Sequence, residues 1–101
     1  MNYNVVIVLF TWDPKKNSIN VIKHRISFEF AATVFSDPLH LSVIDKKSSD
    51  EERWITIGRS MNLSTIIVVH TYMTHGKQEF IRIISARVAT RREKRQYEEG
   101  I

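Results

Sequence analysis

Residues 81–97 read IRIISARVATRREKRQY, and this stretch decides how the second half of the chain is built. Its first part mixes isoleucine with polar residues as a half-buried β-strand does, and we expect a strand over residues 79–86. Thr90 and Glu93 then have the spacing of a capping box, in which both side chains accept from amides at the start of a helix. The stretch therefore predicts a strand followed by a helix over residues 91–98.

Alternation assigns the residues of this strand to two faces. The face of Arg82 is expected to carry Phe80 and Ile84, and the opposite face Ile81, Ile83 and Ser85. Since the helices need one face of the sheet, we expect the isoleucines in the core. Arg82 is then a candidate for function on the other face, or for an ion pair with a carboxylate such as Glu52 or Glu79.

Two helices are expected earlier in the chain. Asp13-Pro14 is typical of a helix start, because the aspartate accepts from a free amide and proline fits the first helical position. It predicts a helix over residues 14–24, with Ile19 and Ile22 as core contacts. Ser27 precedes a second helix, over residues 28–35, whose apolar stripe is Phe28, Ala31, Ala32 and Phe35.

Four further strands are expected, over residues 5–12, 39–45, 53–58 and 64–72, with turns at 58–62 and 73–77. The element order is then β-α-α-β-β-β-β-α, and short links favour antiparallel neighbours. We therefore predict an α+β fold: an antiparallel β-sheet of four to five strands, two N-terminal helices packed on one face, and a C-terminal helix. With 101 residues, one domain over residues 1–101 is expected.

Composition excludes several kinds of site. The chain has no cysteine, which removes disulfides and thiolate chemistry and suits the cytoplasm. Its four histidines have no metal-ligand spacing, and three glycines provide no phosphate-cradling loop. We therefore expect no metal and no cofactor. The apolar run VVIVLF, residues 5–10, is too short to span a membrane, so no membrane partner is expected.

Positive charge is concentrated near the C-terminus. The net charge is +4, and between Arg82 and Arg95 there are six basic residues and one acidic residue. Such a patch attracts phosphates or an acidic partner. An ordinary solvated helix face explains the charge equally well.

Several motifs follow one another in a fixed order along the chain. They are Phe10, Trp12-Asp13-Pro14, Lys16, Asn20, Lys23-His24, Phe28, Ala31, Val34-Phe35, Asp37-Pro38, Glu52-Arg53, Ile57-Gly58, residues 68–71, residues 81–87, Ala89-Thr90, Glu93 and Tyr97. Taken together, over residues 10–97, they resemble the BrnT family of toxins from bacterial type II toxin–antitoxin systems. The Lys23-His24 pair and the block over residues 81–87 are specific when they occur together.

The resemblance implies a RelE-like fold and a ribonuclease activity that stops translation. It also implies an RNA substrate and a cognate antitoxin that neutralises the toxin, of the ribbon-helix-helix class of DNA-binding proteins. The pair would repress its own operon and would contact operator DNA only through the antitoxin.

One residue departs from the family pattern. The family usually has glycine after Lys23-His24, where this chain has Arg25. Glycine suits a left-handed helix stop, and arginine in that conformation costs roughly 1 kcal/mol. We therefore expect the first helix to end differently here.

RNA cleavage without a metal needs a base, a cation for the phosphorane charge and an acid. The candidates for these roles are Lys23, His24, Arg53, Arg82, Arg87 and Tyr97. We expect Arg82 and Arg87 to hold the phosphate, and Lys23 or His24 to act as base or acid. The residues expected to contact RNA or the partner are Arg25, Arg91, Arg92, Lys94 and Arg95.

Two other classes of function fit the same residues. A binding module would hold nucleic acid or an acidic partner through the basic patch without cleaving. A regulatory subunit would use the helix over residues 91–98 as an interface within a complex. Lys23 and His24 also have a structural explanation, because cations at a helix C-terminus stabilise its dipole.

Overall fold

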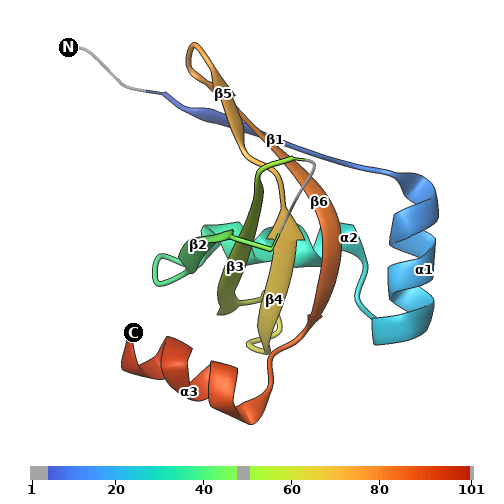
Figure 1. Cartoon of the computed structure of the whole chain (residues 1–101), viewed down its shortest axis with the longest axis vertical. Coiled ribbons are helices and arrows are strands. Elements are labelled where there is room, and N and C mark those ends of the chain that lie inside the picture. Colours follow the sequence, from blue (N-terminus) through green and yellow to red (C-terminus); the bar gives the residue numbers. More distant parts are fainter. Residues whose placement is uncertain (1–4, 48–50, 101) are drawn as a thin grey trace.

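The computed structural model describes residues 5–47 and 51–100. In chain order (Figure 1) the elements are β1 (Ile7–Trp12), α1 (Pro14–His24), α2 (Phe28–Ala31), the 3-10 helix η1 (Ala32–Ser36), β2 (Leu41–Asp45), β3 (Arg53–Arg59), β4 (Thr65–His70), β5 (Met73–His75), β6 (Gln78–Val88) and α3 (Arg91–Glu99). The α+β class is therefore confirmed.

The sheet differs from the prediction in strand number and direction. Within the described residues, six strands form one sheet in the order β1-β6-β4-β3-β2, with the short β5 paired to β6. β1 runs parallel to β6, whereas the other pairs are antiparallel. The prediction of an antiparallel sheet of four to five strands was wrong, because β1 pairs with the distant β6 and because residues 73–75 pair with β6 instead of forming only a turn.

The core lies between the sheet and the segment formed by α2 and η1, which pass behind the sheet in Figure 1. Ser27 caps α2 by accepting from the Phe30 amide. The core residues come from this segment and from β4 and β6: Ile26, Phe28, Ala31, Val34, Ile66, Val68, Ile81, Ile83 and Ala86. The core position of the two isoleucines is confirmed. Of the expected apolar stripe, Phe28 and Ala31 lie in the core, and Ala32 and Phe35 pack against it partly buried. The prediction of one helix over residues 28–35 was wrong, because the α-helix gives way to the 3-10 helix η1 at Ala32.

Helix α1 begins and ends where predicted, but it is held by a polar side chain. The buried Asn20 amide donates to the backbone carbonyls of Ile26 and Ala86 at 2.8 and 2.9 Å, and its oxygen accepts from the Ala86 N–H at 3.1 Å. Beyond the end of β1, Asn20 thus makes the hydrogen bonds to the β6 backbone that a neighbouring strand would otherwise make. Helix α1 is thereby fixed beside β6.

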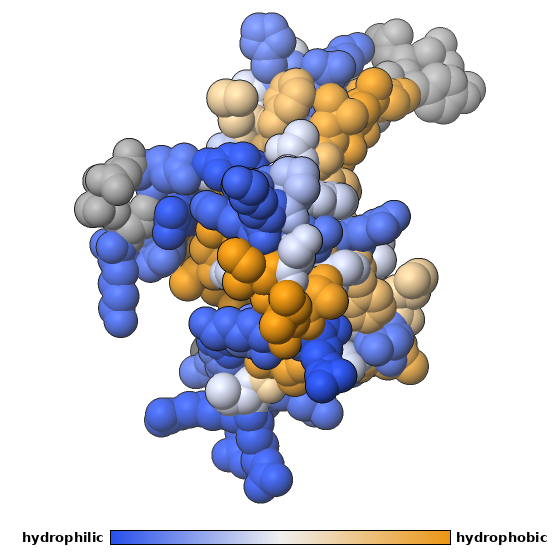
Figure 2. All heavy atoms as spheres, turned by 90° about the vertical axis from the view of Figure 1, so that its right-hand side faces the viewer, coloured by the Kyte–Doolittle hydropathy of each residue, from blue (hydrophilic) through white to orange (hydrophobic). Residues whose placement is uncertain are grey.

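The apolar residues of α1 consequently point outward. Ile19 and Ile22 are 61% and 82% exposed, so their predicted role as core contacts was wrong. Figure 2, which looks onto the side of the molecule that carries α1, shows apolar atoms gathered among hydrophilic ones. The periodicity of α1 therefore marks a surface and not a core stripe.

The end of α1 follows the glycine pattern although the residue is arginine. Arg25 has φ 59° and ψ 29°, and its N–H donates to the Val21 carbonyl. The expectation that the helix ends differently was wrong. Arg25 adopts the left-handed conformation, which favours glycine over a residue with a Cβ atom.

Strand β6 contains an irregularity that changes the faces of its residues. Val69 pairs with Ser85 and His70 pairs with Ile83, which leaves Ile84 as an extra residue on β6. Ser85 therefore moves to the face opposite Ile83, and the predicted alternation fails at this point. The bulge lies between Arg82 and Arg87, and it lets both arginines share one face.

Candidate active site

Three arginines lie on the face of the sheet opposite α2 and η1, here called the arginine face. Trp54 and Ile83 both pair with His70 and lie on the covered side. Because side chains alternate along a strand, their neighbours Arg53 and Arg82 point to the other side. Arg87, which follows the buried Ala86, does the same. Strand geometry thus gathers cations from β3 and β6.

Glu51 joins two of these cations. Arg82 Nη2 donates to both carboxylate oxygens of Glu51, at 2.8 and 2.7 Å, and Arg53 Nε lies 3.9 Å from Glu51 Oε1. The hydrogen bond from Arg82 lowers the pKa of Glu51, and the charges of Arg82, Arg53 and Lys16 add to this effect. Lys16 of α1 therefore belongs to the same electrostatic group.

This partner differs from the carboxylates expected for Arg82. Glu79 accepts instead from the Tyr72 hydroxyl, at 2.8 Å. Glu51 lies in a run of acidic residues, and no periodicity marks it. Sequence reasoning consequently missed both Glu51 and Lys16 as members of the site.

Arg87 ties the end of β6 to α3. Its two terminal nitrogens donate to the two carboxylate oxygens of Glu93, at 2.7 and 2.8 Å. This contact lowers the pKa of Glu93 to about 2 and raises the pKa of Arg87. The Thr90–Glu93 capping box is present as predicted. Glu93 therefore both caps the start of α3 and accepts hydrogen bonds from Arg87.

Lys23 and His24 reach the same strand from α1. They line a cavity of about 170 Å³ with Lys16 and with Ile84 and Ser85 at the bulge of β6. The structure therefore brings Lys23 and His24, the candidates from the first half of the chain, beside the strand that carries Arg82 and Arg87. Ser85 lines this cavity as well. Strict alternation along the strand had predicted it on the opposite face.

Tyr97 lies in a different group. Tyr97 is buried and its hydroxyl donates to Asp37 Oδ2 at 2.5 Å, and the Arg59 guanidinium carbon lies 6.0 Å from the ring centre. Burial and the bond to Asp37 raise the pKa of Tyr97. Tyr97 thus fastens α3 to the turn after η1, and the structure does not gather it with Lys23 and His24.

The second set of predicted residues lies on the surface. All five side chains are exposed: Arg25, Arg91, Arg92, Lys94 and Arg95. Within residues 5–47 and 51–100, no group of three histidine or acidic side chains is placed to hold a metal ion. No helix in the described part of the chain is long and apolar enough to span a membrane.

Comparison with known proteins defines the class. A family model described as the ribonuclease toxin BrnT of type II toxin–antitoxin systems matches residues 12–93, which places the chain in a family of ribonuclease toxins. The chain belongs to the BrnT family, as the resemblance indicated. A crystal structure of the Brucella abortus ribonuclease toxin BrnT matches with a TM-score of 0.52 and 23% identity, covering 85% of this chain and 100% of that one.

At this identity the structural match shows a shared fold. No curated protein matches the sequence. The family match begins at Trp12, so most of β1 lies outside it. Five of the six candidate catalytic residues lie inside the matched segment, and Tyr97 lies outside it.

Proposed function

We propose that the chain is a metal-independent endoribonuclease whose active site is the arginine face together with the end of α1. The proposal rests on one observation: Arg53, Arg82 and Arg87 share a face of the sheet, and Lys23 and His24 meet that sheet at the β6 bulge. Cleavage of cellular RNA would stop translation, which is how the toxin would act in the cytoplasm.

The geometry supports the following catalytic role for each residue. Arg82 and Arg87 would hold the scissile phosphate and stabilise the charge that develops on its oxygens, with Arg53 beside them. Lys23 or His24 would remove the proton of the 2′-hydroxyl or protonate the leaving oxygen. Since the hydroxyl of Tyr97 is bonded to Asp37, we assign Tyr97 to holding α3 in place.

Acidic side chains bond two of the arginines of this site. Glu51 bonds Arg82, and Glu93 bonds Arg87. An RNA phosphate must therefore compete with two carboxylates, of which Glu51 is the more exposed. We propose that the phosphate displaces Glu51 from Arg82. Glu93 would stay bound because it also caps α3, and Arg87 would meet the phosphate with the N–H groups that Glu93 does not use.

We further propose that a cognate antitoxin of the ribbon-helix-helix class neutralises the enzyme by covering α1. The exposed Ile19 and Ile22 lie on the helix that carries Lys23 and His24. A partner that buries these isoleucines would also cover the candidate base. The antitoxin, not this chain, would contact operator DNA.

The test is incubation of the purified chain with RNA in the presence and absence of EDTA. Cleavage that persists in EDTA and yields 2′,3′-cyclic phosphate ends supports the proposal. Cleavage abolished by EDTA and restored by a divalent metal contradicts metal independence. RNA binding without cleavage, by a chain that is folded by circular dichroism, supports the binding-module alternative.

A further inference from the structure

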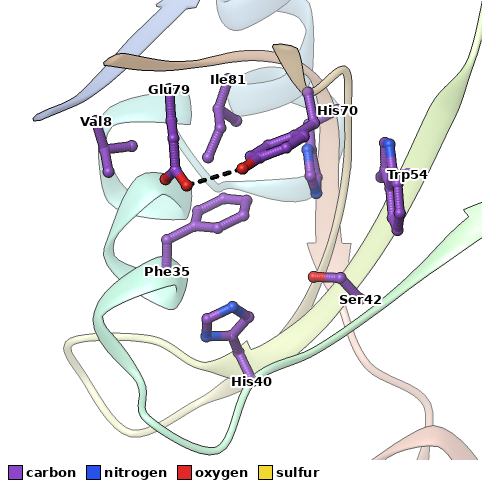
Figure 3. Close-up of a pocket in the computed structure, with 9 residues that line it drawn as sticks. Val8, Phe35, His40, Ser42, Trp54, His70, Glu79 and Ile81 are labelled. Carbon is purple, nitrogen blue, oxygen red and sulfur yellow. Dashed lines mark hydrogen bonds between the residues drawn. The ribbon is translucent and has the colours of Figure 1, made fainter. Parts of the chain in front are cut away.

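A larger cavity, of about 420 Å³, lies on the covered side of the sheet, and none of the six candidate catalytic residues lines it. Its walls come from η1, from the segments that follow η1 and β4, and from strands β1, β2, β3, β4 and β6. Most of the lining side chains carry an aromatic ring, histidine included. Figure 3 shows the side chains of Phe35, His40, Trp54 and Glu79 arranged around a common space. Its volume is in the range of small-molecule sites.

Contacts between the rings hold the walls in place. Phe35 meets His70 edge-on, with ring centres 4.9 Å apart and planes at 85°. Trp54 meets Tyr72 at 6.3 Å and 70°. Such edge-to-face pairs are favourable arrangements of aromatic rings. These contacts hold the aromatic walls of the cavity in fixed positions.

The histidines of this cavity are held by protein atoms. His70 Nδ1 lies 2.9 Å from the Thr71 carbonyl and must donate to it, so Nε2 of the neutral ring accepts from the Thr56 hydroxyl at 2.6 Å. Burial lowers the pKa of His70, which keeps the ring neutral. His40 Nδ1 likewise donates to the Asp37 carbonyl, at 2.7 Å.

Glu79 gives the cavity its charge. Among the described residues that line it, Glu79 is the one Asp, Glu, Lys or Arg. Its carboxylate accepts from the Tyr72 hydroxyl at 2.8 Å and forms no ion pair within the described part of the chain. A basic protein thus places beside aromatic rings a carboxylate that no cation of the described residues neutralises.

We propose that this cavity binds an organic cation, with an ammonium or guanidinium group enclosed by Phe35, Trp54 and Tyr72 and its charge next to Glu79. Aromatic faces attract cations through their quadrupole, and a carboxylate adds to that attraction. A nucleotide fits this arrangement less well, since the carboxylate of Glu79 would repel its phosphate. The group belongs either to a small molecule or to a side chain of a partner protein. The proposal is independent of RNA cleavage, because the arginine face is on the other side of the sheet.

The test uses choline as the probe and 3,3-dimethyl-1-butanol, its neutral isostere, as the control. Indole N–H signals are followed by NMR, because Trp54 lines the cavity and Trp12 does not. We expect choline to shift the Trp54 signal saturably and the Trp12 signal much less, and the isostere to bind at least about fivefold more weakly. Equal binding of choline and the isostere overturns the proposal. The proposal also fails if neither choline nor a peptide with one arginine shifts the Trp54 signal saturably.

Variants and further probes identify the group and its source. Glu79→Gln should weaken choline binding by about fivefold or more, whereas the exposed Glu29→Gln should leave it unchanged. A peptide with one arginine is compared with choline and with the same peptide carrying citrulline in place of arginine. If the arginine peptide binds more tightly than both, the cationic group belongs to a partner protein. A saturable Trp54 shift with uridine or adenosine but not with choline would show a base site and contradict the proposal. If Glu79→Gln fails to fold, the comparison with the isostere on the wild-type chain still decides.

Discussion

At the residue scale, single side chains set features that the sequence pattern did not show. Asn20 occupies the place of a strand beside β6, and Arg25 adopts a conformation that suits glycine. Glu51 neutralises the arginine that the proposed mechanism needs. Each of these roles depends on a contact with a distant residue or on a backbone angle, and residue type alone does not reveal either.

Arg25→Gly should stabilise the protein. The left-handed conformation costs a residue with a Cβ atom about 1–2 kcal/mol, and the greater freedom of unfolded glycine offsets about 0.5–1 kcal/mol of this. We expect a net gain on the order of 0.5–1 kcal/mol in the free energy of unfolding, measured in urea. Arg25→Ala removes the same charge but keeps the Cβ atom, so an equal gain from alanine would contradict this explanation.

Glu51→Gln should strengthen RNA binding, because it frees Arg82 and Arg53 from a competing charge. We expect affinity for a 2′-O-methyl RNA, which is not cleaved, to rise by about threefold or more at low salt. Fluorescence anisotropy gives the affinity. Glu52→Gln is the matched control in the next position. If both variants bind alike, Glu51 does not mask the site.

At the element scale, local signals predicted helices well and strand pairing poorly. Asp13-Pro14 and the Thr90–Glu93 box fix helix starts through neighbouring atoms, and α1 and α3 begin where they indicate. The parallel pairing of β1 with β6 joins residues about seventy positions apart. The bulge at Ile84 also arises from pairing, which neither propensity nor alternation encodes.

The link between β6 and α3 should make stability depend on acid pH. The pKa of Glu93 falls from 4.5 to about 2 in the folded protein, because Arg87 and the helix start favour its charged form. Its stabilising contribution is therefore complete above pH 4.5 and is lost as the pH falls from 4.5 toward 2. Melting temperatures across this range should fall less steeply for Glu93→Gln than for the wild type. Glu99→Gln, an exposed change on the same helix, should keep the wild-type slope, and an unchanged slope in Glu93→Gln would contradict the assignment.

At the scale of the whole molecule, the sheet separates two chemistries. One side presents arginines from β3 and β6 next to α1, and the other holds the core and an aromatic cavity with a carboxylate. The motifs predicted the family and five residues that the fold brings to one region. They did not predict that Tyr97 lies apart with Asp37, since sequence order says nothing about which side of the sheet α3 reaches.

The central claim is that Arg82 and Arg87 hold the phosphate of the RNA that is cut. The most direct measurement is the rate of RNA cleavage in EDTA by Arg82→Ala and by Arg87→Ala. The controls are Lys46→Ala and Lys77→Ala, which each remove one positive charge at an exposed position outside the proposed site. Losing one such contact should lower the rate by about 10²-fold or more, whereas the controls should stay within a few-fold of the wild type. Wild-type rates in folded Arg82→Ala and Arg87→Ala would contradict the account.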